Sequence, residues 1–175
     1  MKINKMINLK LLVIDVDGTM TDSGIYYDEK GNEIKKFCTK DAAGFFAAKK
    51  AGIKILVLTG RKSLATEKRM NELKVDYLFQ GVKNKASFLS DFIKKNEYNK
   101  QDIGYIGDDL NDLQAMRLTN FVCCPLDSCQ EIIDNADYVS KMRGGYGVVR
   151  DVIEFILRNN SQWKKIINDI YDAGI

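Results

Sequence analysis

The chain has 175 residues, of which 29% are charged and 45% hydrophobic, with one proline and no histidine. A single domain of this length buries roughly 70% of its surface, and the ordinary composition excludes disordered and collagen-like proteins. The absence of histidine excludes a Ser-His-Asp triad, a histidine general base and any His-bearing zinc site. Acid–base chemistry must therefore use carboxylates, lysine, tyrosine or cysteine.

The charge balance and the cysteine spacing limit which partners and which cellular compartment we expect. Lysine and arginine number 27 against 24 acidic residues, and no block of five like charges occurs, so we expect no nucleic-acid partner. No apolar run reaches the roughly 18 residues of a membrane span. The first apolar run, residues 11–14, is too short for a signal peptide, and the four cysteines form no C-x-x-C pair. We expect a cytoplasmic protein without a membrane partner.

Short apolar runs alternate with longer amphipathic segments. The short runs predict buried strands at 11–14, 53–58, 77–79, 103–106, 121–124 and 138–139. The longer segments predict helices at 41–51 (with Asp41 as its cap), 63–73, 85–96, 112–118, 128–135, 148–158 and from 162 onward. Between the first strand and the first helix, residues 25–37 predict a β-hairpin that turns around residues 30–32.

Strands that alternate with helices predict βαβ units and a parallel sheet. We expect a doubly wound, Rossmann-like α/β fold with helices on both faces and the hairpin inserted after the first strand. Residues 1–175 are expected to form one domain, with a C-terminal tail at 159–175.

Polar residues follow three of the predicted strands. They are Asp15, Asp17, Thr59, Gly60, Asp108, Asp109 and Asp112. In such sheets ligands bind beyond the carboxyl ends of the strands, so these side chains should meet at one edge. Several carboxylates in one place repel one another unless a cation holds them, and an all-oxygen site suits Mg²⁺.

The remaining groups at this edge suit a phosphate. Thr59 with Gly60 offers a hydroxyl and backbone N–H groups, and Lys85 offers a positive charge. Asp15 can attack phosphorus to form an aspartyl-phosphate. Asp17, two residues along an extended chain, points to the same side and can protonate the leaving oxygen and then activate water. Mg²⁺ offsets the carboxylate–phosphate repulsion.

Four motifs in this order resemble the haloacid dehalogenase superfamily of phosphotransferases. They are D-x-D-G-T at 15–19, T-G at 59–60, a lone Lys85, and G-D-D-x-x-D at 107–112. The resemblance implies that Asp15 is the nucleophile and Asp17 the acid/base. It also implies that Mg²⁺ is held by Asp15, the Asp17 backbone carbonyl and Asp108, with Asp109 and Asp112 in support.

The segment between Asp17 and Thr59 holds one hairpin and one helix, which leaves no room for a cap domain. The chain is similar to the capless branch of the superfamily, in particular the 3-deoxy-D-manno-octulosonate 8-phosphate phosphatases and relatives that act on nine-carbon sialic-acid-type 9-phosphates. This similarity extends over most of residues 10–155. It implies a phosphorylated sugar acid as substrate and a homotetramer in which a neighbour's hairpin and tail complete each open site.

The T-G-R-K run at 59–62 looks like the eight-carbon group, and residues 26–52 and 75–82 also look like the nine-carbon group. We therefore expect a Mg²⁺-dependent phosphatase of 3-deoxy-D-manno-octulosonate 8-phosphate, with a nine-carbon 9-phosphate as the alternative substrate. The arginines among the candidate binding residues could pair with the sugar's carboxylate. The candidates are Asp17, Gly60, Arg61, Lys85, Asn111 and Arg143.

Other interpretations fit less well. A calcium loop of the EF-hand type needs glycine at position six, whereas Gly18 stands at position four after a strand. A phosphorelay receiver carries its acid pair first, whereas here the pair at 108–109 comes last. A non-catalytic regulatory subunit with the same fold is the alternative from a different class, and the intact motifs argue against it.

Overall fold

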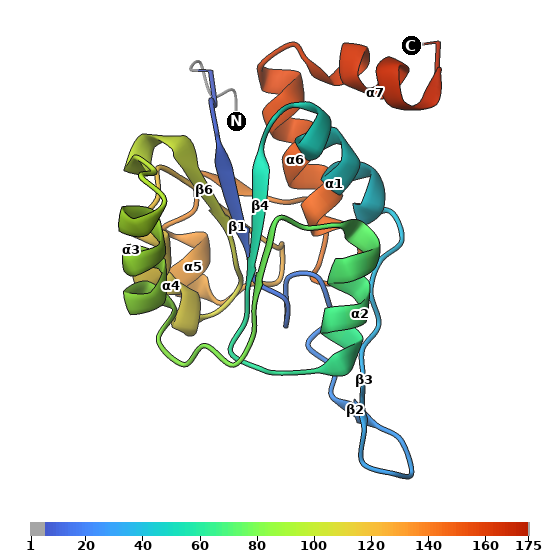
Figure 1. Ribbon diagram of the computed structural model, residues 1–175, viewed down its shortest axis with the longest axis vertical. Coiled ribbons are helices and arrows are strands. Elements are labelled where there is room, and N and C mark those ends of the chain that lie inside the picture. The colour runs from blue at the N-terminus through green and yellow to red at the C-terminus, as the bar shows by residue number, and fades with distance from the viewer. Residues whose placement is uncertain (1–5, 175) are drawn as a thin grey trace.

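The computed structural model describes residues 6–174 and contains a six-stranded parallel sheet with β1 in its interior (Figure 1). The strand order is β5-β4-β1-β6-β7-β8, and each neighbouring pair is parallel. The strands are β1 Leu11–Ile14, β4 Lys54–Leu58, β5 Tyr77–Phe79, β6 Ile103–Ile106, β7 Phe121–Cys124 and β8 Tyr138–Val139. Every predicted strand of the sheet is present, and β4 begins one residue later than expected.

Helices cover both faces of this sheet, which confirms the doubly wound α/β fold. Figure 1 shows helices on both sides of the sheet. Side chains of β1 alternate between two cores: Leu12 and Ile14 pack with α1, α2, α6 and α7, whereas Leu11 and Val13 pack with α3, α4 and α5. The helices are α1 Asp41–Lys50, α2 Leu64–Leu73, α3 Lys85–Lys95, α4 Leu110–Met116, α5 Gln130–Ile133, α6 Val148–Asn159 and α7 Trp163–Tyr171, with a short 3₁₀ turn η1 at Lys100–Asp102.

Two helices differ from the predicted bounds by two residues, whereas the others agree to within one residue. Helix α4 begins two residues earlier than expected because the Asp109 carboxylate accepts a hydrogen bond from the Leu110 N–H (2.8 Å) and caps it. Helix α5 keeps only the middle four residues of its predicted span. None of the helices within residues 6–174 combines the length and apolar surface needed to cross a bilayer.

The predicted hairpin forms from β2 Tyr26–Tyr27 and β3 Glu33–Ile34, which pair antiparallel and project from the carboxyl end of the sheet (Figure 1). Asp28 closes the turn by accepting hydrogen bonds from the Lys30 and Asn32 N–H groups.

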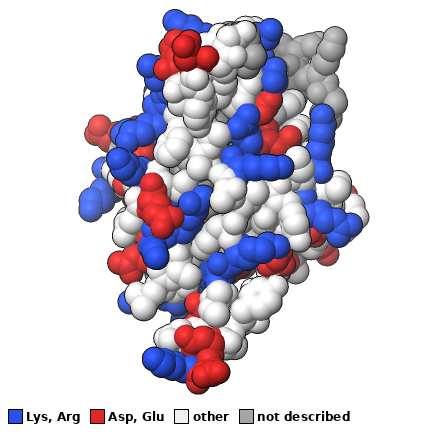
Figure 2. All heavy atoms as spheres, turned by 90° about the vertical axis from the view of Figure 1, so that its right-hand side faces the viewer, with Lys and Arg blue, Asp and Glu red and all other residues white. Residues whose placement is uncertain are grey.

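On the face turned toward the viewer in Figure 2, acidic, basic and uncharged side chains are interspersed, so the described residues there form no continuous basic surface.

Asp41 has a different role from the predicted one. The expectation that it caps its own helix is wrong, because its buried carboxylate accepts a hydrogen bond from the Arg150 N–H (3.0 Å) in the first turn of α6. Gly44 allows this contact between helices, since a Cβ at that position would lie 2.9 Å from the Arg150 Cα. Asp41 therefore joins α1 to the positive end of α6.

Asp41 gives the stability of the fold a pH dependence. Burial raises its pKa to about 6, against the hydrogen bond from Arg150 and the charge of Arg69. Because the folded-state pKa lies above the usual value, the protonated carboxyl stabilises the fold below about pH 4, and this contribution is lost as the pH rises through about 6. Over that range the free energy of unfolding should fall by up to roughly 3 kcal/mol relative to Asp41→Asn, which keeps the acceptor but does not titrate.

Urea denaturation of both proteins between about pH 4 and about pH 7 measures this difference. Asp91→Asn, an exposed change on α3, is the control and should follow the wild type. Parallel pH profiles for the wild type and Asp41→Asn would contradict the prediction.

Candidate active site

Polar side chains gather at the carboxyl ends of the central strands. Asp15 directly follows β1, Thr59 follows β4, and Asp108 stands one residue beyond the glycine after β6. Together they open onto a cavity of about 250 Å³. Its lining residues are Asp15, Asp17, Ser23, Thr59, Gly60, Arg61, Asp108, Asp109 and Asn111. Of these, only Ser23 was absent from the predicted site, and no motif marks it.

Lys85 lies at the buried centre of the site. It is the first residue of α3, and its ammonium is 2.7 Å from Asp15 Oδ1 and 2.6 Å from Asp112 Oδ1. The Tyr105 hydroxyl also donates to Asp112 Oδ1 (2.7 Å), and the Asp108 N–H donates to Asp112 Oδ2 (3.2 Å). Both Asp112 oxygens are thus engaged by the protein, and this residue holds Lys85 beside Asp15. Sequence reasoning missed Tyr105, which stands within an apolar strand.

The carboxylates of this centre are crowded. Burial raises the pKa of Asp15 well above its usual value, and Asp112 adds to the effect while Lys85 opposes it. Burial and the charge of Asp112 likewise raise the pKa of Asp108 to about 7, although a hydrogen bond from Thr19 opposes the shift. Burial and the repulsion between neighbouring carboxylates therefore both disfavour the ionised forms of Asp15 and Asp108.

A cation fits this arrangement. Carboxylate oxygens of Asp15, Asp108 and Asp112 lie within 4.8 Å of one another. Gly18 has a φ of +90°, and a Cβ there would lie 1.9 Å from Asp108 Oδ2, so only glycine lets the loop after β1 approach this carboxylate. Because the donors are all oxygen, they suit a hard divalent cation such as Mg²⁺.

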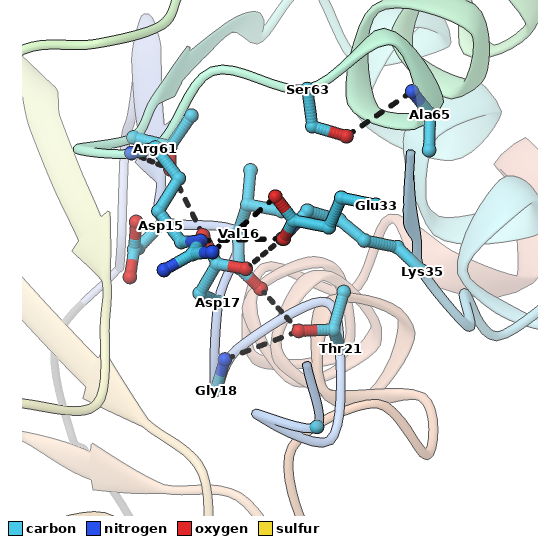
Figure 3. Close-up of polar contacts among 12 residues, drawn as sticks. Asp15, Val16, Asp17, Gly18, Thr21, Glu33, Lys35, Arg61, Ser63 and Ala65 are labelled. Atoms are coloured by element: carbon cyan, nitrogen blue, oxygen red, sulfur yellow. Dashed lines mark hydrogen bonds and ion pairs between the residues drawn. The ribbon is translucent and has the colours of Figure 1, made fainter. Parts of the chain in front are cut away.

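Asp17 lies beside this centre, and its two carboxylate oxygens have different partners (Figure 3). Oδ2 accepts a hydrogen bond from the Thr59 hydroxyl (3.3 Å), and Oδ1 forms an ion pair with Lys35 of the hairpin. Glu33 of β3 pairs with both Lys35 (2.8 Å) and Arg61 (3.3 Å). Sequence reasoning missed Glu33 and Lys35, which stand in no motif.

The other predicted residues divide into two groups. Gly60, Asp109 and Asn111 line the cavity, as does Arg61. The backbone N–H of Arg61 donates a hydrogen bond to the Thr59 hydroxyl (3.3 Å). Arg143 is exposed and lies outside the lining residues. The structure therefore brings together every predicted site residue except Arg143.

Comparisons with known proteins agree with this geometry. No family model matches the chain. The chain is 36% identical over 155 residues to the 3-deoxy-D-manno-octulosonate 8-phosphate phosphatase KdsC of Escherichia coli K12. The matched region covers 89% of this chain and 82% of the relative. A crystal structure of the 3-deoxy-D-manno-octulosonate 8-phosphate phosphatase of Moraxella catarrhalis, in complex with magnesium, phosphate and KDO, has a TM-score of 0.88 at 34% identity and covers 93% of both chains.

The cobalt-bound deoxy-D-mannose-octulosonate 8-phosphate phosphatase of Haemophilus influenzae has a TM-score of 0.84 at 30% identity and covers 89% of this chain and 91% of its own. Identity at this level over nearly the whole length of the relatives goes beyond a shared fold. On these grounds the chain belongs to the 3-deoxy-D-manno-octulosonate 8-phosphate phosphatase family of the haloacid dehalogenase superfamily.

Proposed function

We propose that this protein is a Mg²⁺-dependent phosphatase that hydrolyses 3-deoxy-D-manno-octulosonate 8-phosphate. The observation that carries the proposal is the pairing of Asp15 with the buried Lys85, beside Asp17 and at the edge of a cavity. This pairing supports the assignment of Asp15 as the nucleophile, Lys85 as a phosphate-binding charge and Asp17 as the acid/base of one site. The names of the relatives support the substrate, and the Moraxella catarrhalis enzyme holds magnesium, phosphate and KDO.

In the first half of the reaction, an Asp15 oxygen forms a bond to phosphorus while the bond from phosphorus to the sugar oxygen breaks. Asp17 gives its proton to that leaving oxygen, so the sugar acid departs as an alcohol. Lys85 stabilises the ionised form of Asp15 and the negative charge of the phosphoryl group. Thr59 contributes its hydroxyl to the phosphate site and a hydrogen bond to Asp17.

In the second half, Asp17 takes a proton from a water molecule as the water oxygen attacks phosphorus, and the bond to Asp15 breaks to release phosphate. Asp15, the Asp17 backbone carbonyl and Asp108 would hold Mg²⁺, whose positive charge would offset the carboxylate–phosphate repulsion. Asp112 supports this arrangement through Lys85 and the Asp108 N–H, and Asp109 supports it by capping α4.

We assign the recognition of the sugar acid to the rim of the cavity. Gly60, Arg61 and Asn111 line it, and the guanidinium of Arg61 suits a carboxylate. Arg143 is exposed outside the cavity, so it would contact only a part of the sugar that extends beyond the rim.

A substrate panel with Mg²⁺ tests the proposal. The kcat/KM for octulosonate 8-phosphate should exceed that for nine-carbon 9-phosphates by about 10-fold or more, since a site fitted to one chain length discriminates against one extra carbon by roughly this factor. Hexose phosphates, which lack the carboxylate, should be poorer still. Chelation of the metal should abolish turnover, and added Mg²⁺ should restore it. Preference for a hexose phosphate, or turnover that chelation leaves unchanged, would contradict the proposal.

We also propose that the protein works in the cytoplasm as a homotetramer, in which each subunit is one domain of residues 1–175. Four apolar side chains of the hairpin are at least half exposed: Ile25, Tyr26, Tyr27 and Ile34. Such a surface next to an open site suits contact with another copy, and the hairpin (25–37) and the tail (159–175) could then cover a neighbouring cavity. A monomer by light scattering would contradict the assembly.

The four free cysteines suit a reducing compartment, which supports the location in the cytoplasm.

A further inference from the structure

The hairpin sends one lysine into the active site. The side chain of Lys35 is only 2% exposed, although it belongs to a hairpin that projects from the body of the protein (Figure 1). By contrast, Lys30 and Lys36 of the same hairpin are exposed. Burying an ammonium group is costly unless it is paired, and Lys35 pairs with Asp17 and Glu33. Its burial therefore reflects a specific contact with the site.

This contact completes the immobilisation of Asp17. Lys35 holds Oδ1 of Asp17 (Figure 3), and the Thr59 hydroxyl donates a hydrogen bond to Oδ2. Donors on both oxygens fix the plane of a carboxylate as well as its position. Because proton transfer to a leaving oxygen depends strongly on placement, such a fixed carboxylate is suited to act as acid and base.

Glu33 in turn holds Lys35. Its Oε1 lies 2.8 Å from the Lys35 ammonium and 3.3 Å from Arg61 Nε, so the four charged groups alternate in sign from Arg61 to Asp17. Glu33 is itself largely buried, with a side chain 13% exposed. A buried network whose members are all paired restricts each of them to one arrangement.

We propose that Lys35 is a positioning residue for Asp17, and that Glu33 anchors it. The hairpin then contributes to proton transfer within its own subunit, in addition to any role in assembly. This inference rests on the proposed function, in which Asp17 acts as the acid and base.

Lys35→Met tests the inference, because methionine keeps the apolar stem and removes the charged donor. The measurement is kcat/KM with Mg²⁺ for aryl phosphates of increasing leaving-group pKa, since this ratio reports the steps up to departure of the phenol. Phenyl phosphate needs the proton from Asp17, whereas p-nitrophenolate departs without it. The variant should lose roughly 10- to 100-fold on phenyl phosphate and less than about 3-fold on p-nitrophenyl phosphate.

A second experiment tests whether Lys35 acts through Asp17. On phenyl phosphate, Lys35→Met combined with Asp17→Asn should lose no more than Asp17→Asn alone. Lys30→Met, the same change at an exposed position of the hairpin, should keep the wild-type dependence on the leaving group. An equal loss on all aryl phosphates, no loss, or additive losses in the double variant would each overturn the inference.

Thermal unfolding checks the fold of each variant. If Lys35→Met does not fold, Glu33→Gln replaces it, because this change keeps Lys35 and removes the charge of its anchor. It should steepen the dependence on the leaving group in the same direction by a smaller factor, and an unchanged dependence would overturn the inference. The proposed function fails separately, if the wild type hydrolyses neither the sugar-acid phosphate nor any aryl phosphate with Mg²⁺.

Discussion

Asp15→Asn is expected to reduce the release of phosphate from octulosonate 8-phosphate by at least about 10⁴-fold with Mg²⁺ present. The neutral amide cannot attack phosphorus, so the remaining groups of the site would have only water as a nucleophile. The change is nearly isosteric and removes a buried carboxylate whose pKa is raised by burial and by Asp112. The free energy of unfolding should therefore stay close to that of the wild type.

Three measurements make this prediction specific to the nucleophile. Phosphate release gives the rate, urea denaturation gives the stability, and mass spectrometry after rapid quenching should find phosphate on the Asp15 peptide of the wild type only. Asp91→Asn makes the same chemical change on the exposed surface of α3 and should keep wild-type activity. Turnover retained by a correctly folded Asp15→Asn protein would exclude the aspartyl-phosphate route.

The sheet and the centre of the site could be predicted because both depend on local patterns. Apolar runs such as 103–106 mark strands that are buried on both faces, and the polar residues that follow them must meet at one edge of the sheet. This placed Asp15, Thr59 and Asp108 around one cavity without any knowledge of how the helices pack.

Contacts that depend on tertiary placement were missed. Lys35 and Lys36 are adjacent lysines in a polar hairpin, and only the position of the hairpin over the site decides that Lys35 is buried against Asp17. Asp41 stands where a helix cap is expected, but its partner Arg150 lies 109 residues further along the chain. The apolar run around Tyr105 predicts a core residue, and its ring is indeed buried, but its hydroxyl also donates a hydrogen bond to Asp112.

Lys85→Met is expected to lower the free energy of unfolding by about 3–5 kcal/mol, in addition to impairing catalysis by at least about 100-fold. The ammonium lies between Asp15 and Asp112, and all three side chains are at most 4% exposed. Its removal leaves two buried carboxylates without their counter-charge, whereas methionine fills almost the same space. Urea denaturation in the absence of divalent metal measures the loss of stability.

The matched control is Lys10→Met, which breaks a surface ion pair of similar length. Lys10 lies 2.8 Å from Asp102, but its side chain is 68% exposed, so the change should cost no more than about 1 kcal/mol. Adding Asp112→Asn to Lys85→Met removes one of the two unpaired carboxylates and should recover part of the stability while leaving activity low. If Lys85→Met were no more destabilising than Lys10→Met, the buried carboxylates would not depend on Lys85. Recovery of activity together with stability would instead reduce Lys85 to a structural role.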